Sequence, residues 1–182
     1  MDEYHHYIPQ FILRKFNIQK NVKNKKNIKI KYYNIKDNKL EICKTIRKYG
    51  VYNLYKDLNS EKVMEVEKEL SKLENKCSNI INTILESNKH IEIKKKKMDE
   101  LIKFLYIMMY RKKSRKEQYL ESNFDDTTKD ILDEFMYKHN MKNYEDIWLN
   151  NIKELLKTDH NQIKYNNKIS PIIKTEYIEI IN

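Results

Sequence analysis

Histidine and arginine are the side chains of this sequence best suited to acid-base or phosphate chemistry, and both occur in one short stretch near the start. The segment HHYIPQFILRKF, residues 5–16, holds two of the five histidines and one of the four arginines. Histidine can give or take a proton near neutral pH, and arginine can bind a phosphate through two parallel hydrogen bonds. We therefore interpret His6 as a candidate catalytic acid or base, with Tyr7 and Arg14 as candidate substrate-binding residues.

A structural interpretation of the same stretch stays open. His6 lies shortly before a proline that can begin a helix, so its ring can simply hydrogen-bond the incoming chain. His5 and His6 are adjacent and point apart on most backbones, and no Asp, Glu or Cys follows at metal-ligand spacing. We expect no bound metal and no cofactor.

A second pair of candidate residues is Arg111 and Arg115. They are four residues apart, so they share one helical stripe with Met108 and Phe104. An ordinary helix end, where cations oppose the helix dipole, is the structural alternative. Lysines serve that purpose equally well and are already present nearby, so the two arginines indicate an anion-binding or active site.

Three basic clusters indicate a polyanionic partner, at residues 20–31, 94–97 and 111–116. In the first of them, alternation places Lys29, Lys31 and Tyr33 on one strand face, which offers phosphate contacts beside a ring that can stack on a base. RNA or another single strand is favoured over duplex DNA, because the sequence has no helix-turn-helix or zinc-finger pattern. Codon bias is the competing explanation, since Lys, Asn and Ile together make 79 of 182 residues.

Composition favours one helix-rich domain. The chain has 182 residues, 40% of them apolar, with a formal net charge of +10 and a single Gly, which argues against glycine-dependent phosphate loops and against an all-β fold. No apolar stretch is long enough to span a membrane, and the acidic, histidine-rich start is unlike a signal peptide, so we expect a cytoplasmic protein without membrane contact. Cys43 and Cys77 are expected to be thiols. The sequence does not determine an oligomeric state.

Hydrophobic periodicity predicts a helix-dominated α+β fold, a helical core of two long and two or three shorter helices with a small antiparallel β-hairpin or sheet. One domain over residues 1–182 begins with a motif helix at 5–18, in which Ile12 and Phe16 share a face, and continues with a hairpin at 27–46. A helical core follows over 60–157, and a strand over 174–181. Within the core, the pattern predicts helices at 60–87, 94–120, 125–139 and 143–157.

The opening stretch resembles the signature of a bacterial family known as domain of unknown function 4238, whose members typically begin His-Tyr-Val-Pro-x-Phe-x-Leu-Arg-x-Phe. The similarity continues through an aromatic VYNLY segment to the helix that ends FLYIMMYRKKSR, about residues 5–116. A Thr-Ser-Asp-x-Pro-like segment of many members is missing here, so the chain resembles a short form. The resemblance implies no established activity. It carries over Arg111, which closes the family's central helix, and the residues of the opening motif: His6, Tyr7, Pro9, Phe11, Leu13, Arg14 and Phe16.

Together these features predict a protein that binds nucleic acid, RNA rather than DNA, or a protein–nucleic acid complex, within a bacterial or mobile-element defence or counter-defence system. If it is an enzyme, metal-independent phosphodiester cleavage is the expected reaction, with His6 as acid or base and the arginines stabilising phosphate charge. A non-enzymatic interaction module or inhibitor, for example a phage counter-defence protein, is a second hypothesis. In a third, Tyr7, Arg14 and Arg111 form a buried polar cluster that fastens the N-terminal segment to the core.

Overall fold

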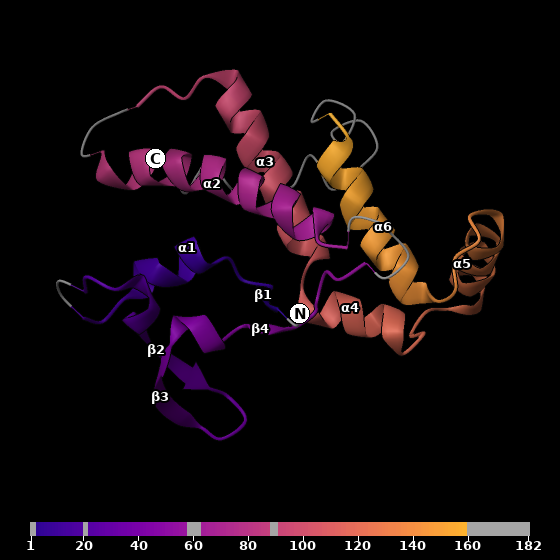
Figure 1. The fold of residues 1–182 in the computed structure, drawn as a ribbon, viewed down its shortest axis with the longest axis horizontal. Coiled ribbons are helices and arrows are strands. Elements are labelled where there is room, and N and C mark those ends of the chain that lie inside the picture. Colours follow the sequence, from indigo (N-terminus) through magenta and orange to yellow (C-terminus); the bar gives the residue numbers. More distant parts are fainter. Residues whose placement is uncertain (1–2, 20–21, 58–62, 88–90, 160–182) are drawn as a thin grey trace.

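The computed structural model describes residues 3–19, 22–57, 63–87 and 91–159 (Figure 1). Within these ranges the chain forms six α-helices and two small antiparallel sheets of two strands each. The helix-dominated α+β class predicted from the sequence is therefore confirmed. Figure 1 shows the β2–β3 sheet on one side of the molecule, below the long helices, with the β1–β4 pair between this sheet and the helices.

The N-terminal motif is a strand followed by a short helix, not one helix over residues 5–18. Strand β1 (Tyr4–His6) pairs antiparallel with β4 (Gly50–Tyr52), and the chain then enters helix α1 (Gln10–Leu13) through the buried Pro9. Helix α1 continues as one 3-10 turn, η1 (Arg14–Phe16). Phe16, at the end of this turn, is 66% exposed.

The single glycine of the chain is needed where β4 approaches β1. Gly50 lies opposite His6 in the strand register. A Cβ atom added to Gly50 would lie 2.3 Å from the backbone oxygen of His5, well inside van der Waals contact. Any other residue would push the two strands apart, so glycine at this position holds the motif strand against the rest of the fold.

The predicted hairpin is present. Strands β2 (Lys29–Asn34) and β3 (Lys39–Lys44) pair antiparallel, with Lys31 opposite Ile42 and Tyr33 opposite Leu40. Asn38 takes a left-handed backbone conformation in the turn, which asparagine tolerates better than most residues. Two 3-10 turns, η2 (Lys25–Asn27) and η3 (Thr45–Arg47), lie side by side at the base of the hairpin.

Five helices make up the body of the protein, and they agree with the predicted ones except at one break. Their bounds are α2 (Glu65–Glu86), α3 (Lys95–Tyr110), α4 (Lys113–Leu120), α5 (Asp126–Lys138) and α6 (Tyr144–Lys157). Asp125 and Asn143 cap α5 and α6 through their side chains. The predicted helix start at residue 60 and the predicted strand at 174–181 lie outside the described residues. That the chain is a single domain stays a prediction.

The predicted long helix over residues 94–120 is wrong, because the chain turns at Arg111 and Lys112 and divides it into α3 and α4. In a continuous helix, the backbone oxygen of Tyr110 would accept a hydrogen bond from the residue four positions later. Here it accepts one from the indole Nε1 of Trp148 instead, at 3.0 Å. Tertiary contacts, rather than a glycine or a proline, thus end α3.

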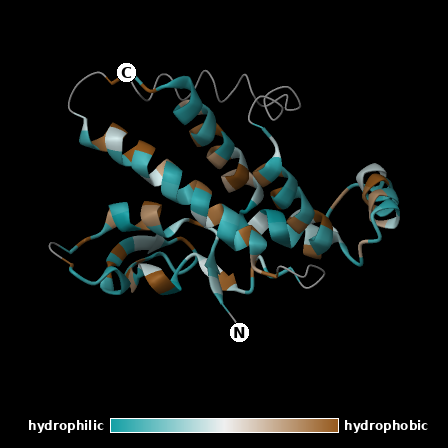
Figure 2. Ribbon diagram, turned by 45° about the horizontal axis from the view of Figure 1, so that its top comes forward, coloured by the Kyte–Doolittle hydropathy of each residue, from teal (hydrophilic) through white to brown (hydrophobic). Residues whose placement is uncertain are grey.

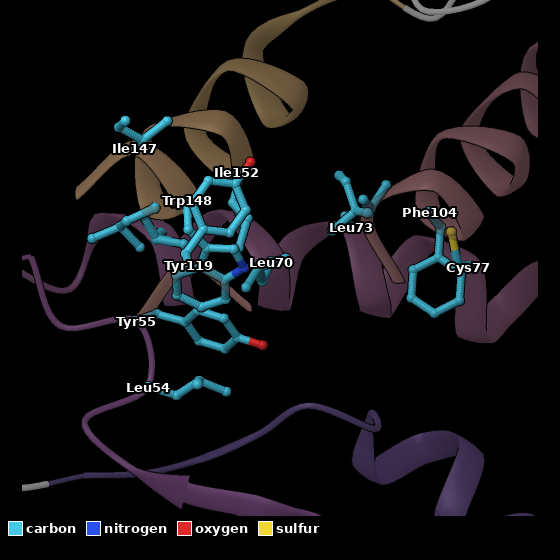
Figure 3. Packing of buried hydrophobic residues seen from close by; sticks show 13 residues of the cluster. Leu54, Tyr55, Leu70, Leu73, Cys77, Phe104, Tyr119, Ile147, Trp148 and Ile152 are labelled. Atoms are coloured by element: carbon cyan, nitrogen blue, oxygen red, sulfur yellow. The ribbon is translucent and has the colours of Figure 1, made fainter. Parts of the chain in front are cut away.

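The hydrophobic core lies between α2, α3, α4 and α6 (Figure 3). At its centre the ring of Tyr55 stacks on Trp148, with ring centroids 5.9 Å apart, and His5 stacks on Tyr55 from the side of β1. Trp148 and Cys77 are fully buried, among the other buried residues of α6 and α2. Figure 2 shows α5 apart from the other helices, and none of the residues of α5 is fully buried.

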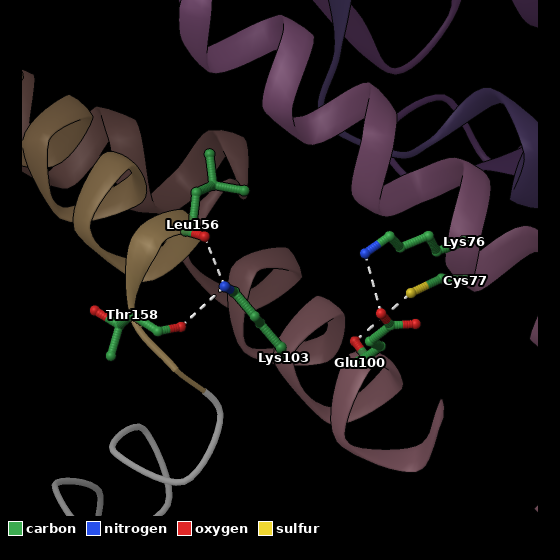
Figure 4. A network of polar contacts seen from close by, with 6 residues as sticks. All are labelled: Lys76, Cys77, Glu100, Lys103, Leu156 and Thr158. Atoms are coloured by element: carbon green, nitrogen blue, oxygen red, sulfur yellow. Dashed lines mark hydrogen bonds and ion pairs between the residues drawn. The ribbon is translucent and has the colours of Figure 1, made fainter. Parts of the chain in front are cut away.

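Polar contacts at the far end of the helices tie α3 to both of its neighbours (Figure 4). The ammonium of Lys103 donates to the backbone oxygens of Leu156 and Thr158, at 2.6 and 2.9 Å, at the C-terminus of α6. Lys76 of α2 forms an ion pair with Glu100 of α3. A cation at the last carbonyls of a helix stabilises it by charge-assisted hydrogen bonding and by opposing the helix dipole.

We expect Lys103→Met to lower the free energy of unfolding by about 1 to 2 kcal/mol, because two bonds from a charged donor are lost. Urea denaturation followed by circular dichroism measures the change. Lys97→Met is the matched control, since Lys97 is exposed on the same helix and its change should stay within about 0.5 kcal/mol. Equal losses in the two variants would show that the contact of Lys103 with α6 does not contribute.

In the part of the chain that the structure describes, none of the helices has the length and apolar character needed to cross a bilayer.

Candidate nucleic-acid interface

The residues predicted from the sequence fall into three separate places. Two of them, His6 and Arg111, meet in a polar cluster under the β1–β4 pair. Arg115 lies in a pocket beside the end of α3, and the lysines and tyrosine of the hairpin lie on the open face of the β2–β3 sheet. The predicted convergence of both helix arginines around one anionic group is therefore not what the contacts show.

Arg111 is 2% exposed, and its donors face protein acceptors. Its Nε donates to the hydroxyl of Tyr55 at 2.8 Å, one terminal nitrogen pairs with Glu74, and the other donates to the backbone oxygen of His6. Burial acts to lower the pKa of Arg111, but Tyr55 and Glu74 raise it on balance, so the guanidinium stays charged. These contacts are the ones expected from the third hypothesis, in which a buried polar cluster that includes Arg111 fastens the N-terminal segment to the core.

His6 is half-buried in a network with Gln10 and Thr45. The amide nitrogen of Gln10 lies 2.6 Å from Nε2 of His6 and donates to the backbone oxygen of Thr45 at 3.0 Å. Nε2 of His6 also lies 3.2 Å from the backbone oxygen of Thr45, so it accepts from Gln10 in one tautomer and donates to Thr45 in the other. Burial lowers the pKa of His6, the backbone of Thr45 opposes this, and the charges of Arg111 and Arg14 lower it further. These contacts are expected of a histidine whose ring hydrogen-bonds the chain near the start of helix α1. This was the structural alternative to a catalytic role.

Tyr7 and Arg14 lie near this cluster without joining its hydrogen bonds. Tyr7 packs against the hydrophobic core, and its ring meets the edge of Tyr49, with centroids 6.4 Å apart. Arg14 is partly buried, and its Nε has no hydrogen-bond partner among the described residues. Four further members of this cluster were not predicted from the sequence: His5, Tyr55, Glu67 and Glu74. Only the adjacent aromatic residues of VYNLY gave a signal that this segment packs on the motif.

The open face of the β2–β3 sheet has the composition of a binding surface. Lys29, Lys31 and Tyr33 are exposed there, as predicted, while Ile28 and Ile30 are buried on the other side. The pairing adds three residues of β3 that the sequence analysis did not single out. We call these six residues the hairpin face: Lys29, Lys31, Tyr33, Leu40, Ile42 and Lys44.

The hairpin face combines exposed apolar side chains with cations. Tyr33, 54% exposed, lies opposite Leu40, 58% exposed, at the turn end of the face, and Ile42, also 58% exposed, lies opposite Lys31 in its middle. Lysines stand at one end of both strands, with Lys29 opposite Lys44. Rings and aliphatic groups can pack on nucleobases while neighbouring cations contact phosphates.

The positive charge of the chain is concentrated around this sheet. Residues 14–48 contain 13 basic and two acidic residues, which leaves 24 basic and 25 acidic residues in the rest of the sequence. Codon bias explains why lysine is frequent throughout, but it does not explain why acidic residues are scarce in this segment alone. The net charge of +10 is therefore a local property of the segment that contains the hairpin.

None of the described residues form a group of three or more His, Cys, Asp or Glu that could hold a metal ion.

The architecture defines a helix-dominated α+β protein with a basic two-stranded sheet at one side. The family model of a protein of unknown function, DUF4238, matches residues 4–182, so the chain belongs to this family. The match extends well beyond residue 116, where the resemblance in the sequence ended, and includes the second half of the chain. No curated protein and no solved structure matches the chain.

Proposed function

We propose that this protein binds single-stranded nucleic acid, RNA in preference to DNA, through the hairpin face, and that it does so in the cytoplasm. The observation that carries the proposal is the excess of 11 positive charges within residues 14–48, in a chain that is otherwise nearly neutral. Such a local excess of positive charge attracts a polyanion, and binding releases the counterions that were condensed on the polyanion.

The shape of the surface favours a single strand. The exposed surface is a short sheet, and a sheet with an exposed ring can accept unstacked bases. Tyr33 provides the ring, and Lys29, Lys31 and Lys44 lie within the same face for phosphate contacts. Lys25, Lys26 and Arg47, on the turns at the base of the hairpin, are exposed and extend the basic surface.

The contacts of His6 and Arg111 support binding rather than cleavage. The ring of His6 is engaged with the amide of Gln10 and the backbone oxygen of Thr45, and the guanidinium of Arg111 is directed at Tyr55, Glu74 and a backbone oxygen. A nuclease mechanism would need both groups turned toward a phosphate. A defence or counter-defence role would follow from binding a foreign RNA or an RNA-guided complex.

The triple variant Lys29→Gln, Lys31→Gln, Lys44→Gln tests the hairpin face. Its affinity for a labelled single-stranded RNA of about ten nucleotides should fall at least about tenfold in fluorescence anisotropy at about 0.1 M salt. The slope of log K against log salt should also decrease by about 0.7 for each phosphate contact that is lost. Tyr33→Leu should weaken binding with little change in that slope, because it removes stacking and not charge.

The matched control is Lys95→Gln, Lys96→Gln, Lys97→Gln, which removes the same charge from exposed positions in the first turn of α3. Its affinity should stay close to that of the wild type. Equal losses in the two triple variants would show that only overall charge matters and would contradict the proposal. Tighter binding of duplex DNA than of the single strand would contradict it as well.

A protein partner is the second candidate function, and exposed apolar groups favour it. Ile35, in the hairpin turn, is 85% exposed, and it lies close in sequence to the exposed Leu40 and Ile42. An interaction module or inhibitor that docks an acidic protein would use the same cations and these aliphatic groups. The anisotropy measurement distinguishes the two functions, because a protein-docking face predicts no difference in RNA affinity between the two triple variants.

A further inference from the structure

A pocket of about 510 Å³ lies where α3 ends and α4 begins. Tyr106, Met109 and Tyr110 of α3 line one side, and Arg115 and Gln118 of α4 line another. Its volume is within the range of sites that hold small organic ligands. The pocket shares no residue with the hairpin face.

The charge of the pocket is positive. Lys112 and Arg115 contribute two cations, and among the described residues that line the pocket none is acidic. The remaining polar lining consists of the hydroxyl of Ser114 and the amides of Gln118 and Asn123. An anionic group is therefore the charge type that the pocket favours, and the amides and hydroxyl can hydrogen-bond a second polar part of the same ligand.

Arg115 is held in position before any ligand binds. A terminal nitrogen of its guanidinium donates to the side-chain oxygen of Gln118 at 2.7 Å, and the amide of Gln118 donates to the backbone oxygen of Asn123 at 3.2 Å. The guanidinium also lies over the ring of Tyr110, 5.7 Å from its centroid. An arginine that is already ordered loses little conformational entropy on binding, and its other N–H groups can receive an anion.

The part of the pocket that α3 lines is aromatic and apolar. Tyr106 is almost completely buried, and Tyr110 and the partly exposed Met109 complete this wall. Because Tyr106 is only 3% exposed, the accessible flat surfaces are the ring of Tyr110 and the guanidinium plane of Arg115, on which a planar heterocycle can stack. A ligand that has both an anionic group and a planar ring therefore uses every feature of the pocket.

We propose that this pocket binds a nucleoside monophosphate, with the phosphate at Arg115 and Lys112 and the base against the tyrosine wall. The site is independent of the hairpin face. The mononucleotide is a second ligand, beside the single-stranded nucleic acid proposed above. A separate binding measurement tests it.

Isothermal titration calorimetry with the full chain and adenosine and cytidine monophosphates tests the site. We expect saturable binding at one site, and weaker binding of adenosine and of inorganic phosphate, each of which has only one of the two groups. Arg115→Gln should weaken nucleotide binding at least about tenfold, and Arg115→Lys should weaken it less, because the charge remains and the planar fork is lost. Lys113→Gln is the matched control, since Lys113 is exposed on the same turn and does not line the pocket.

Lys112→Gln keeps the test decisive if Arg115→Gln alters the fold, because Lys112 is exposed and its loss should still weaken binding of the nucleotide. No saturation with either nucleotide at millimolar concentration would overturn the proposal. Equal affinity of Lys113→Gln and Arg115→Gln, or binding of inorganic phosphate as tightly as the nucleotide, would overturn it too. The triple variant of the hairpin face should bind the nucleotide normally, so failure of RNA binding and failure of this site are distinguishable.

Discussion

Arg111→Met is expected to lower the free energy of unfolding by about 3 to 5 kcal/mol. The substitution leaves the carboxylate of Glu74, the hydroxyl of Tyr55 and the backbone oxygen of His6 without their buried donor. Removing one member of a buried ion pair costs more than the pair contributes, because the remaining groups keep their desolvation penalty. The expected loss is a large part of the total stability of a small domain.

Urea denaturation followed by the fluorescence of Trp148, the single tryptophan of the chain, measures this loss. Trp148 is fully buried beside Tyr55, so its emission reports on the same region of the core. The free energy of unfolding of Arg111→Lys should lie between those of the wild type and Arg111→Met, since an ammonium keeps the charge and reaches fewer acceptors. Lys112→Met, at the exposed neighbouring position, is the control and should change stability by less than about 0.5 kcal/mol.

The double variant Arg111→Met, Glu74→Leu separates the effect of charge from that of packing. If an unpaired carboxylate causes most of the loss, removing it should restore part of the stability, and the two substitutions should not be additive. A loss below about 1 kcal/mol for Arg111→Met alone would contradict a fastening role. The guanidinium would then be available for a ligand, as the active-site hypothesis from the sequence requires.

The hairpin could be predicted from the sequence because its information is local. Alternating residues in both strands and the Asp-Asn pair in the turn place Lys29, Lys31 and Tyr33 on the exposed face, and the structure has them there. The residues that β3 adds to the hairpin face were harder to predict. Leu40 and Ile42 alternate in the same way, but they join Tyr33 and Lys31 only through a register that the turn sets.

The polar cluster under β1 and β4 could not be predicted, because its members are far apart in the sequence. Arg111 contacts residues 37, 56 and 105 positions away. Helix α3 likewise ends where the indole of Trp148, 38 positions away, donates to the backbone oxygen of Tyr110, at a point where the sequence has neither glycine nor proline and a periodic pattern predicts a continuous helix. The β1–β4 pair is also short, with three residues in each strand, which is too few for alternation to indicate a strand.

Glu67 is the group in this cluster without a matching donor. It is partly buried on α2, and its Oε2 has no hydrogen-bond partner among the described residues. The pKa of Glu67 is raised from its ordinary 4.5 to about 7, chiefly by burial, with the charge of Arg111 opposing and the nearby carboxylates of Glu74 and Glu3 adding to the rise. The guanidinium of Arg111 thus acts on two carboxylates: it forms an ion pair with Glu74, and it interacts with Glu67 only through its charge.

Glu67→Gln is therefore expected to stabilise the protein above neutral pH. An acid whose pKa is higher in the folded state binds more protons there than in the unfolded state, so stability falls as pH rises from about 4.5 to about 7. At pH about 8 Glu67 is ionised, and the buried carboxylate lowers the free energy of unfolding of the wild type by about 3 kcal/mol for a shift of this size. The variant avoids this cost, and its advantage should disappear as the pH falls toward 4.5.

The difference in unfolding free energy between wild type and Glu67→Gln, measured across this pH range, isolates the effect. His5 and His6 act in the opposite direction, because burial lowers the pKa of both, and stability is lost as pH falls below their ordinary 6.5. Both proteins have these histidines, so their contribution cancels in the difference. Glu65→Gln, at an exposed position in the same turn, should show no comparable gain at high pH.

An equal advantage at low and high pH would mean that the glutamine improves packing and that ionisation of Glu67 is not the cause. The two large predictions are also linked, because the charge of Arg111 lowers the pKa of Glu67 and its removal should raise that pKa further. In the background of Arg111→Met, Glu67→Gln should therefore stabilise the protein more than in the wild type. An unchanged gain in that background would show that the two groups do not interact, and the cluster would then be two separate sites.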